Sequence, residues 1–138
     1  MKQILDALQV AEKQYRTNLI QMAKGQGVTV AEWTLLGYVN DGYDTQDKLS
    51  KGMALDNSTL SRQLKSLVKK ELVESEVISH DNRQLRYRLT QKGLDTMTAL
   101  VDAQAEFNNQ VFSVWSDEEK RMMEILLNRL DKSINKIA

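Results

Sequence analysis

The chain of 138 residues contains no cysteine, no proline and a single histidine, His80. Without cysteine, the chain offers no disulfide framework, thiolate metal site, cysteine nucleophile or thiol redox sensor. One histidine cannot form a multi-histidine metal site, and helices without proline can run long and unkinked. No apolar run approaches the roughly 18 residues of a membrane span. We therefore expect a protein that needs no metal and no other cofactor.

Length and composition predict one soluble domain over residues 1–138. The sequence is 41% hydrophobic and 28% charged, as in ordinary globular proteins, and a chain of this length buries a substantial core. The opening segment, MKQILDALQVAEKQ, lacks the apolar block and small-residue cleavage site of a signal peptide. We therefore expect the protein in the cytoplasm.

The net charge of zero conceals a gradient along the chain. Residues 44–92 hold 10 basic and 7 acidic residues, whereas residues 93–138 hold 5 basic and 8 acidic residues. Such an asymmetry hints at an anionic partner for the middle segment alone, although many solvated surfaces have a similar balance.

Long helices are predicted at both ends of the chain. Apolar spacing predicts a helix over 2–23, Thr90 is expected to cap a helix from about residue 91, and Ser116 with Glu119 forms a capping box that opens the last helix. The predicted inward positions of the helix from about residue 91 are Leu94, Met97, Leu100, Val101, Phe107 and Val111. The last helix is expected to carry a broad apolar face, formed by Met122, Met123, Leu126, Leu127, Leu130, Ile134 and Ile137. Because a small domain cannot cover so much apolar surface, we expect a homodimer. The positions predicted to pack between the two chains are Ile4, Leu8, Leu126, Leu130 and Ile134.

The middle of the chain changes its periodicity. A Thr29–Glu32 capping box opens a second helix, and short helices are predicted over 45–52 and about 57–70. Alternation of apolar and polar residues over 72–78 and 85–89 predicts a β-hairpin. The expected fold is mainly α with a small β-hairpin wing, that is, a winged helix-turn-helix with long N- and C-terminal dimerisation helices.

The helix over 57–70 has two different faces. Leu60, Leu64, Leu67 and Val68 are expected on one side, and the opposite side is predicted to hold Ser58, Thr59, Arg62, Lys65, Ser66, Lys69 and Lys70. In helix-turn-helix proteins the N-terminal end of this helix enters the major groove, where arginine pairs with guanine O6 and N7. Lysines further along are placed for phosphates. The pattern predicts a DNA-reading helix.

The predicted hairpin adds a second basic feature. Arg86 and Arg88 share one strand face, and Arg83 lies at the tip, from which an arginine can enter the minor groove. Asp81 is expected to accept a hydrogen bond from Arg83 and to orient its guanidinium. Taken singly, each of these residues could be an ordinary solvated side chain; together, directly after the reading helix, they indicate DNA binding.

The chain resembles the multiple antibiotic resistance regulator (MarR) family in the order of its motifs. These are DNSTLSR over 56–62, LVKKELV over 67–73, DNR over 81–83 and LTQKG over 89–93, together with AEWTLL over 31–36 and TQDKLS over 45–50. The family usually has glycine where Glu71 stands. If the backbone there requires a positive φ, Glu71 is strained by about 1 kcal/mol; alternatively, the helix ends differently and the wing angle changes.

The resemblance implies a homodimeric repressor that binds a pseudo-palindromic operator near its own gene. It implies a DNA-binding lobe over about 29–90 and a helical dimerisation lobe over about 2–24 and 91–137. It also places Thr45, Gln46 and Asn57 with the DNA-binding residues. Many family members release DNA when a small aromatic or phenolic molecule binds. The residues that could line such a pocket are Tyr15, Met22, Trp33 and Tyr38, for which core packing is the plainer interpretation.

The sequence leaves two other functional classes as alternatives. A winged-helix adaptor that binds protein would show no duplex binding even at low salt. An enzyme is disfavoured because the chain has no cysteine, no nucleotide-binding loop and no Ser–His arrangement in a recognisable context. The adjacent acids Glu118 and Glu119 are better explained by the capping box than by acid–base chemistry.

Overall fold

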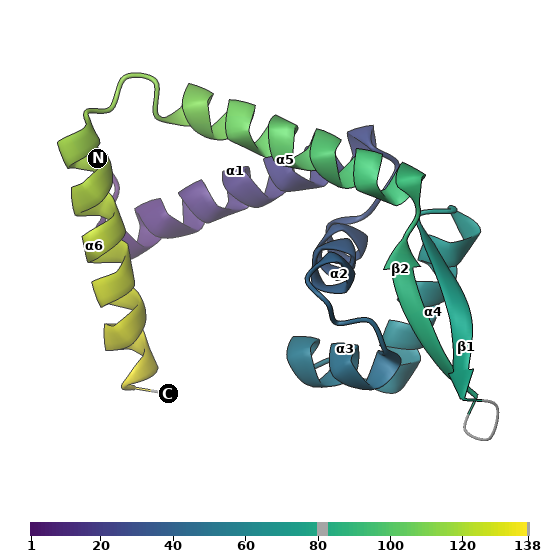
Figure 1. The fold of residues 1–138 in the computed structure, drawn as a ribbon. Coiled ribbons are helices and arrows are strands. Elements are labelled where there is room, and N and C mark those ends of the chain that lie inside the picture. Colours follow the sequence, from purple (N-terminus) through teal and green to yellow (C-terminus); the bar gives the residue numbers. More distant parts are fainter. Residues whose placement is uncertain (80–82, 138) are drawn as a thin grey trace. The chain divides into compact units, whose positions relative to one another are not determined.

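A computed structural model describes residues 1–79 and 83–137 and confirms a mainly helical winged helix-turn-helix (Figure 1). The elements in order are α1 (Ile4–Gly25), α2 (Val30–Asn40), α3 (Gln46–Met53), α4 (Asn57–Lys69), β1 (Val73–Ser79), β2 (Gln84–Leu89), α5 (Gln91–Val111) and α6 (Asp117–Asn135). The chain forms two compact units, Met1–Ala103 and Gln104–Ala138. The reading helix and the wing both belong to the first unit.

The helix starts follow local capping chemistry. The Thr29 hydroxyl accepts a hydrogen bond from the Glu32 N–H at 3.0 Å, and Glu32 accepts one from the Thr29 N–H at 2.9 Å. Ser116 and Glu119 repeat this reciprocal pair at the start of α6. The capping boxes read from the sequence are therefore confirmed, because each depends only on residues three apart.

The hairpin has the alternation that its sequence predicts. β1 and β2 pair antiparallel, with Val73 opposite Leu89, Glu74 opposite Arg88 and Glu76 opposite Arg86. Tyr87 is buried, whereas the arginines on either side of it are exposed. One face of the wing thus joins the core and the other carries charge.

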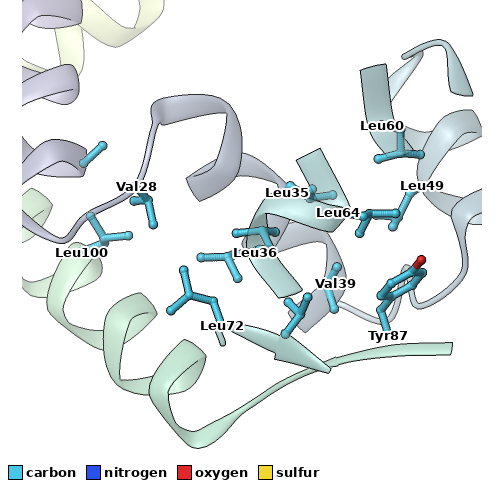
Figure 2. Packing of buried hydrophobic residues seen from close by; sticks show 13 residues of the cluster. Val28, Leu35, Leu36, Val39, Leu49, Leu60, Leu64, Leu72, Tyr87 and Leu100 are labelled. Atoms are coloured by element: carbon cyan, nitrogen blue, oxygen red, sulfur yellow. The ribbon is translucent and has the colours of Figure 1, made fainter. Parts of the chain in front are cut away.

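The core of the first unit is built mainly by α2, α3, α4 and the hairpin, and Figure 2 shows its packing. Its buried members are Ala23, Val28, Leu35, Leu36, Val39, Leu49, Leu60, Leu64, Leu67, Leu72, Val73, Tyr87 and Leu100. The expectation that Val68, Leu94, Val101 and Val111 point inward is wrong for this single chain, because all four are exposed. Amphipathic spacing predicts which residues form an apolar face, but not which part of the protein or of a partner chain covers that face.

The end of α4 has the backbone geometry that the family's glycine would favour. Glu71 adopts a φ of 62°, in the left-handed region. Its N–H donates to the Val68 carbonyl, and the Leu72 N–H donates to the Leu67 carbonyl, both at 3.0 Å. This pair of bonds is the Schellman ending of a helix, in which glycine usually occupies the left-handed position. Of the two alternatives, strain at Glu71 is therefore the one observed.

The backbone between β2 and α5 packs closely against the segment that precedes β1. The Thr90 N–H donates to the Leu72 carbonyl at 3.1 Å, and the Thr90 hydroxyl donates to the Glu71 carbonyl at 2.6 Å. The same hydroxyl accepts the Gly93 N–H at 3.0 Å, which confirms Thr90 as the cap of α5. A Cβ at Gly93 would collide with the Leu72 carbonyl oxygen. Glycine at this position allows the two backbones to approach.

Candidate nucleic-acid interface

The first turn of α4 is held by its N-cap, Asp56. The Asp56 carboxylate accepts the Thr59 N–H at 2.7 Å and the Ser58 hydroxyl at 2.9 Å. These bonds, the backbone one first, hold the pKa of Asp56 below its usual value. The Gln46 amide donates to the Asn57 carbonyl at 3.3 Å and so joins the starts of α3 and α4. The predicted contact residues of both helices are thus brought together.

The outward face of α4 carries positive charge that is not held in ion pairs within the described part of the chain. Arg62, Lys65 and Lys69 are exposed, and none of them lies within ion-pair distance of a carboxylate among residues 1–79 and 83–137. The helix contains no acidic residue. Its exposed small side chain Ser58 precedes these cations along the helix, as the sequence indicated.

The structure gives Ser66 an internal role, which corrects its assignment to the outward face. Its hydroxyl donates to the Glu32 carboxylate at 2.8 Å. Lys70, also expected to face outward, donates to the same carboxylate at 2.7 Å and to the Gly27 carbonyl at 3.0 Å. Glu32 is buried on α2. Ser66 and Lys70 therefore lie on the side of α4 that packs against α2.

Glu32 is ionised in spite of its burial. Burial raises the pKa of Glu32, but hydrogen bonds from Lys70, Thr29 and Ser66 together lower it below its usual value. A buried carboxylate with three donors fixes the C-terminal end of α4 against the start of α2. The orientation of the reading helix therefore depends on a charged group away from its exposed face.

The wing arginines are exposed but paired. Arg88 Nε lies 2.7 Å from Glu74 Oε1, and Arg86 lies 3.4 Å from Asp44 and 3.7 Å from Glu76. Their availability for phosphates is therefore lower than that of unpaired arginines. The sequence pattern alone did not show these pairs, because they depend on the register between the two strands.

Arg83 is exposed directly before β2, with a left-handed φ of 49°. Asp81, predicted to orient it, and His80 lie outside the described residues. A groove of about 340 Å³ brings Arg83 together with predicted residues from α3 and α4; its lining comprises Thr45, Gln46, Asp47, Asn57, Arg83, Gln84, Leu85 and Tyr87. Three separate sequence motifs thus meet in one hollow beside the reading helix.

The predicted effector residues lie on α1 and α2 and are at least partly exposed. Tyr15 is 44% exposed, whereas Met22, Trp33 and Tyr38 are half-buried. Trp33 and Tyr38 pack against the core, and the Tyr38 ring meets Tyr43 edge-to-face at 5.0 Å. The three hollows described have other linings. An effector pocket at these residues stays a prediction.

The predicted dimerisation positions are partly or fully exposed in the single chain. Ile4, Leu126 and Ile134 are at least half exposed, and Leu8 and Leu130 are half-buried. Within residues 1–79 and 83–137, no helix is long and apolar enough to cross a membrane. The same residues contain no cluster of three or more side chains suited to a metal ion.

Comparison with known sequences agrees with these features. The MarR family profile matches residues 26–84. The HTH-type transcriptional regulator SarZ of Staphylococcus epidermidis is 29% identical over 137 residues, covering 98% of this chain and 91% of SarZ. The uncharacterized HTH-type transcriptional regulator YxaD of Bacillus subtilis is 34% identical over 86 residues, covering 62% of this chain and 60% of YxaD.

Solved structures share the fold. MepR, a transcription regulator of the Staphylococcus aureus multidrug efflux pump MepA, superposes with a TM-score of 0.82 at 20% identity, covering 96% of this chain and 99% of MepR. MepR in a S. aureus MepR–DNA complex gives a TM-score of 0.69 at 22% identity, covering 93% of this chain and 94% of that chain.

Proposed function

We propose, on the premise that this chain belongs to the MarR family, that it is a homodimeric, sequence-specific DNA-binding repressor of nearby genes. The observation that carries the proposal is the unpaired cationic face of α4 beside the groove that joins α3, α4 and the wing. The solved complex of MepR with DNA shows that one protein of this fold binds DNA.

Each group on this surface has a definite task. Ser58 and Thr59 let the start of α4 approach the major groove closely, and Arg62 makes paired hydrogen bonds to a guanine. Lys65 and Lys69 bind phosphates, which adds affinity without sequence information. Arg83 enters the flanking minor groove. The residues placed beside them are Thr45, Gln46 and Asn57.

A dimer explains the apolar surface that a single chain leaves exposed. Two copies that join through their terminal helices, in the lobe over 2–24 and 91–137, bury residues such as Ile4 and Leu126. A two-fold dimer presents its two α4 helices to half-sites about 34 Å apart, one helical turn of DNA. The operator is therefore pseudo-palindromic. The dimer acts in the cytoplasm, on double-stranded DNA.

Release of DNA follows from any ligand that favours another spacing of the two reading helices. A ligand shifts that equilibrium only by binding the two arrangements with different affinity. We assign this role to a small aromatic or phenolic molecule that contacts Tyr15, Met22, Trp33 and Tyr38. The half-burial of three of these residues leaves each of them partly accessible.

Selection of bound duplexes from a random pool tests the proposal. We expect enrichment of palindromic sites with half-sites one helical turn apart. Arg62→Ala should weaken binding to the selected site by about 1–3 kcal/mol and relax the preference at one position of each half-site. Absence of duplex binding even at low salt would instead favour a winged-helix protein adaptor, since phosphate contacts strengthen as salt falls.

A further inference from the structure

Acidic residues are built into the wing directly opposite its arginines. Glu74 faces Arg88 and Glu76 faces Arg86 across the antiparallel pair, and both pairs lie within ion-pair distance, at 2.7 Å and 3.7 Å. Arg86 also approaches Asp44, in the segment before α3, at 3.4 Å. Oppositely charged cross-strand pairs stabilise a hairpin only slightly, because they are exposed. They contribute little to stability, but they offset the positive charge of the arginines on this face of the wing.

The two DNA-facing elements therefore differ in charge. α4 carries Arg62, Lys65 and Lys69 with no acid, whereas the sequence over 73–89 holds three arginines and three acids. At physiological salt, exposed charges act over about 8–10 Å. A DNA phosphate near Arg88 is therefore repelled by the Glu74 carboxylate. To bind Arg88, the phosphate has to displace Glu74 from its ion pair.

We propose that Glu74 and Glu76 are specificity-determining residues. They weaken phosphate binding by the wing, so that sequence-independent attraction to DNA is confined to α4. The inference rests on the proposed DNA-binding function. Non-specific affinity grows with each phosphate neutralised, and it competes with recognition of the operator throughout the genome. Pairing two arginines per chain inside the wing lowers that background while Arg62 retains its contact with bases.

Affinity for a fluorescent random-sequence duplex, measured across a salt series, tests this role. For the double variant E74Q/E76Q we expect affinity at low salt to rise by about tenfold or more, and the slope of log affinity against log salt to steepen by about one to two per bound chain. Glutamine preserves side-chain size at two exposed positions. Glu74→Gln alone should give most of the change in slope, because Arg86 keeps Asp44 as a partner at 3.4 Å when Glu76 is replaced.

Glu12→Gln is the matched control, because Glu12 also forms an exposed ion pair, with Arg16 on α1 at 3.5 Å. This variant should keep the wild-type slope. Equal slopes for wild type and the double variant would overturn the inference, as would an equal change in the Glu12→Gln control. If neither wild type nor variant binds the duplex at the lowest salt, the DNA-binding function itself fails, whereas wild-type binding with no wing effect refutes only the role of the glutamates.

Discussion

Lys70 Nζ lies 2.7 Å from Oε1 of Glu32, whose side chain is only 5% exposed. This ion pair joins the C-terminal end of the reading helix to the start of α2, across 38 residues of sequence. Ser66 contributes a second bond from α4 to the same carboxylate. The reading helix is therefore held by a charged internal anchor as well as by its leucines.

Glu32→Gln should lower the free energy of unfolding by about 2 kcal/mol, because charged hydrogen bonds are lost at a buried site. Denaturant unfolding measures this change. Glu12→Gln, which breaks an exposed pair, should cost less than about 0.5 kcal/mol. Similar losses in the two variants would show that Glu32 has no special structural role.

The contribution of Glu32 should also depend on pH. Its folded-state pKa lies below the ordinary value of 4.5, so its stabilisation is complete above pH 4.5 and is lost as pH falls through the folded-state pKa. The difference in unfolding free energy between wild type and Glu32→Gln should therefore be constant near neutral pH and shrink below pH 4.5. A difference that stays constant down to pH 3 would contradict this assignment.

Glu71→Gly should stabilise the protein by about 0.5–1 kcal/mol. Glycine removes the left-handed strain at φ 62°, although its greater freedom in the unfolded chain offsets part of the gain. Thermal unfolding is a suitable measurement. Glu71→Ala serves as the control, since it removes the charge but keeps the Cβ; an equal gain in both variants would point to charge and not to backbone strain.

Gly93→Ala should destabilise the protein by about 3 kcal/mol, because the added Cβ meets the Leu72 carbonyl and the backbone has to move. Gly37→Ala is the control, and we expect it to change the free energy of unfolding in the opposite direction. Gly37 lies inside α2 with open space around its Cβ position, so alanine should stabilise by about 1 kcal/mol. Equal effects at the two positions in denaturant unfolding would refute the close approach at Gly93.

Local chemistry explains what could be predicted from the sequence. The Thr29 and Ser116 capping boxes, the Thr90 cap and the alternating hairpin all depend on neighbours within a few residues. Ser66 could not be assigned in this way, because its partner Glu32 lies 34 residues earlier. A helical wheel orders the side chains around α4, but only the packing of α2 shows which sector is covered.

The wing illustrates a different limit. The alternation predicted that Arg86 and Arg88 share a face, and this is confirmed. Their pairing with Glu74 and Glu76 depends on the register between the strands, which a shift of one residue would change completely. The DNA contacts assigned to Arg62, Lys65 and Arg83 stay predictions, since they involve a partner outside the chain.

DNA cleavage from a tethered reagent tests the central claim most directly, namely that the starts of two α4 helices read one duplex. Since the chain has no cysteine, Ser58→Cys provides a unique attachment point for an iron chelate, with Glu118→Cys on α6 as the control. The account predicts two clusters of cleavage about one helical turn apart on a selected duplex. Cleavage no stronger than in the control, or a single cluster, would contradict it.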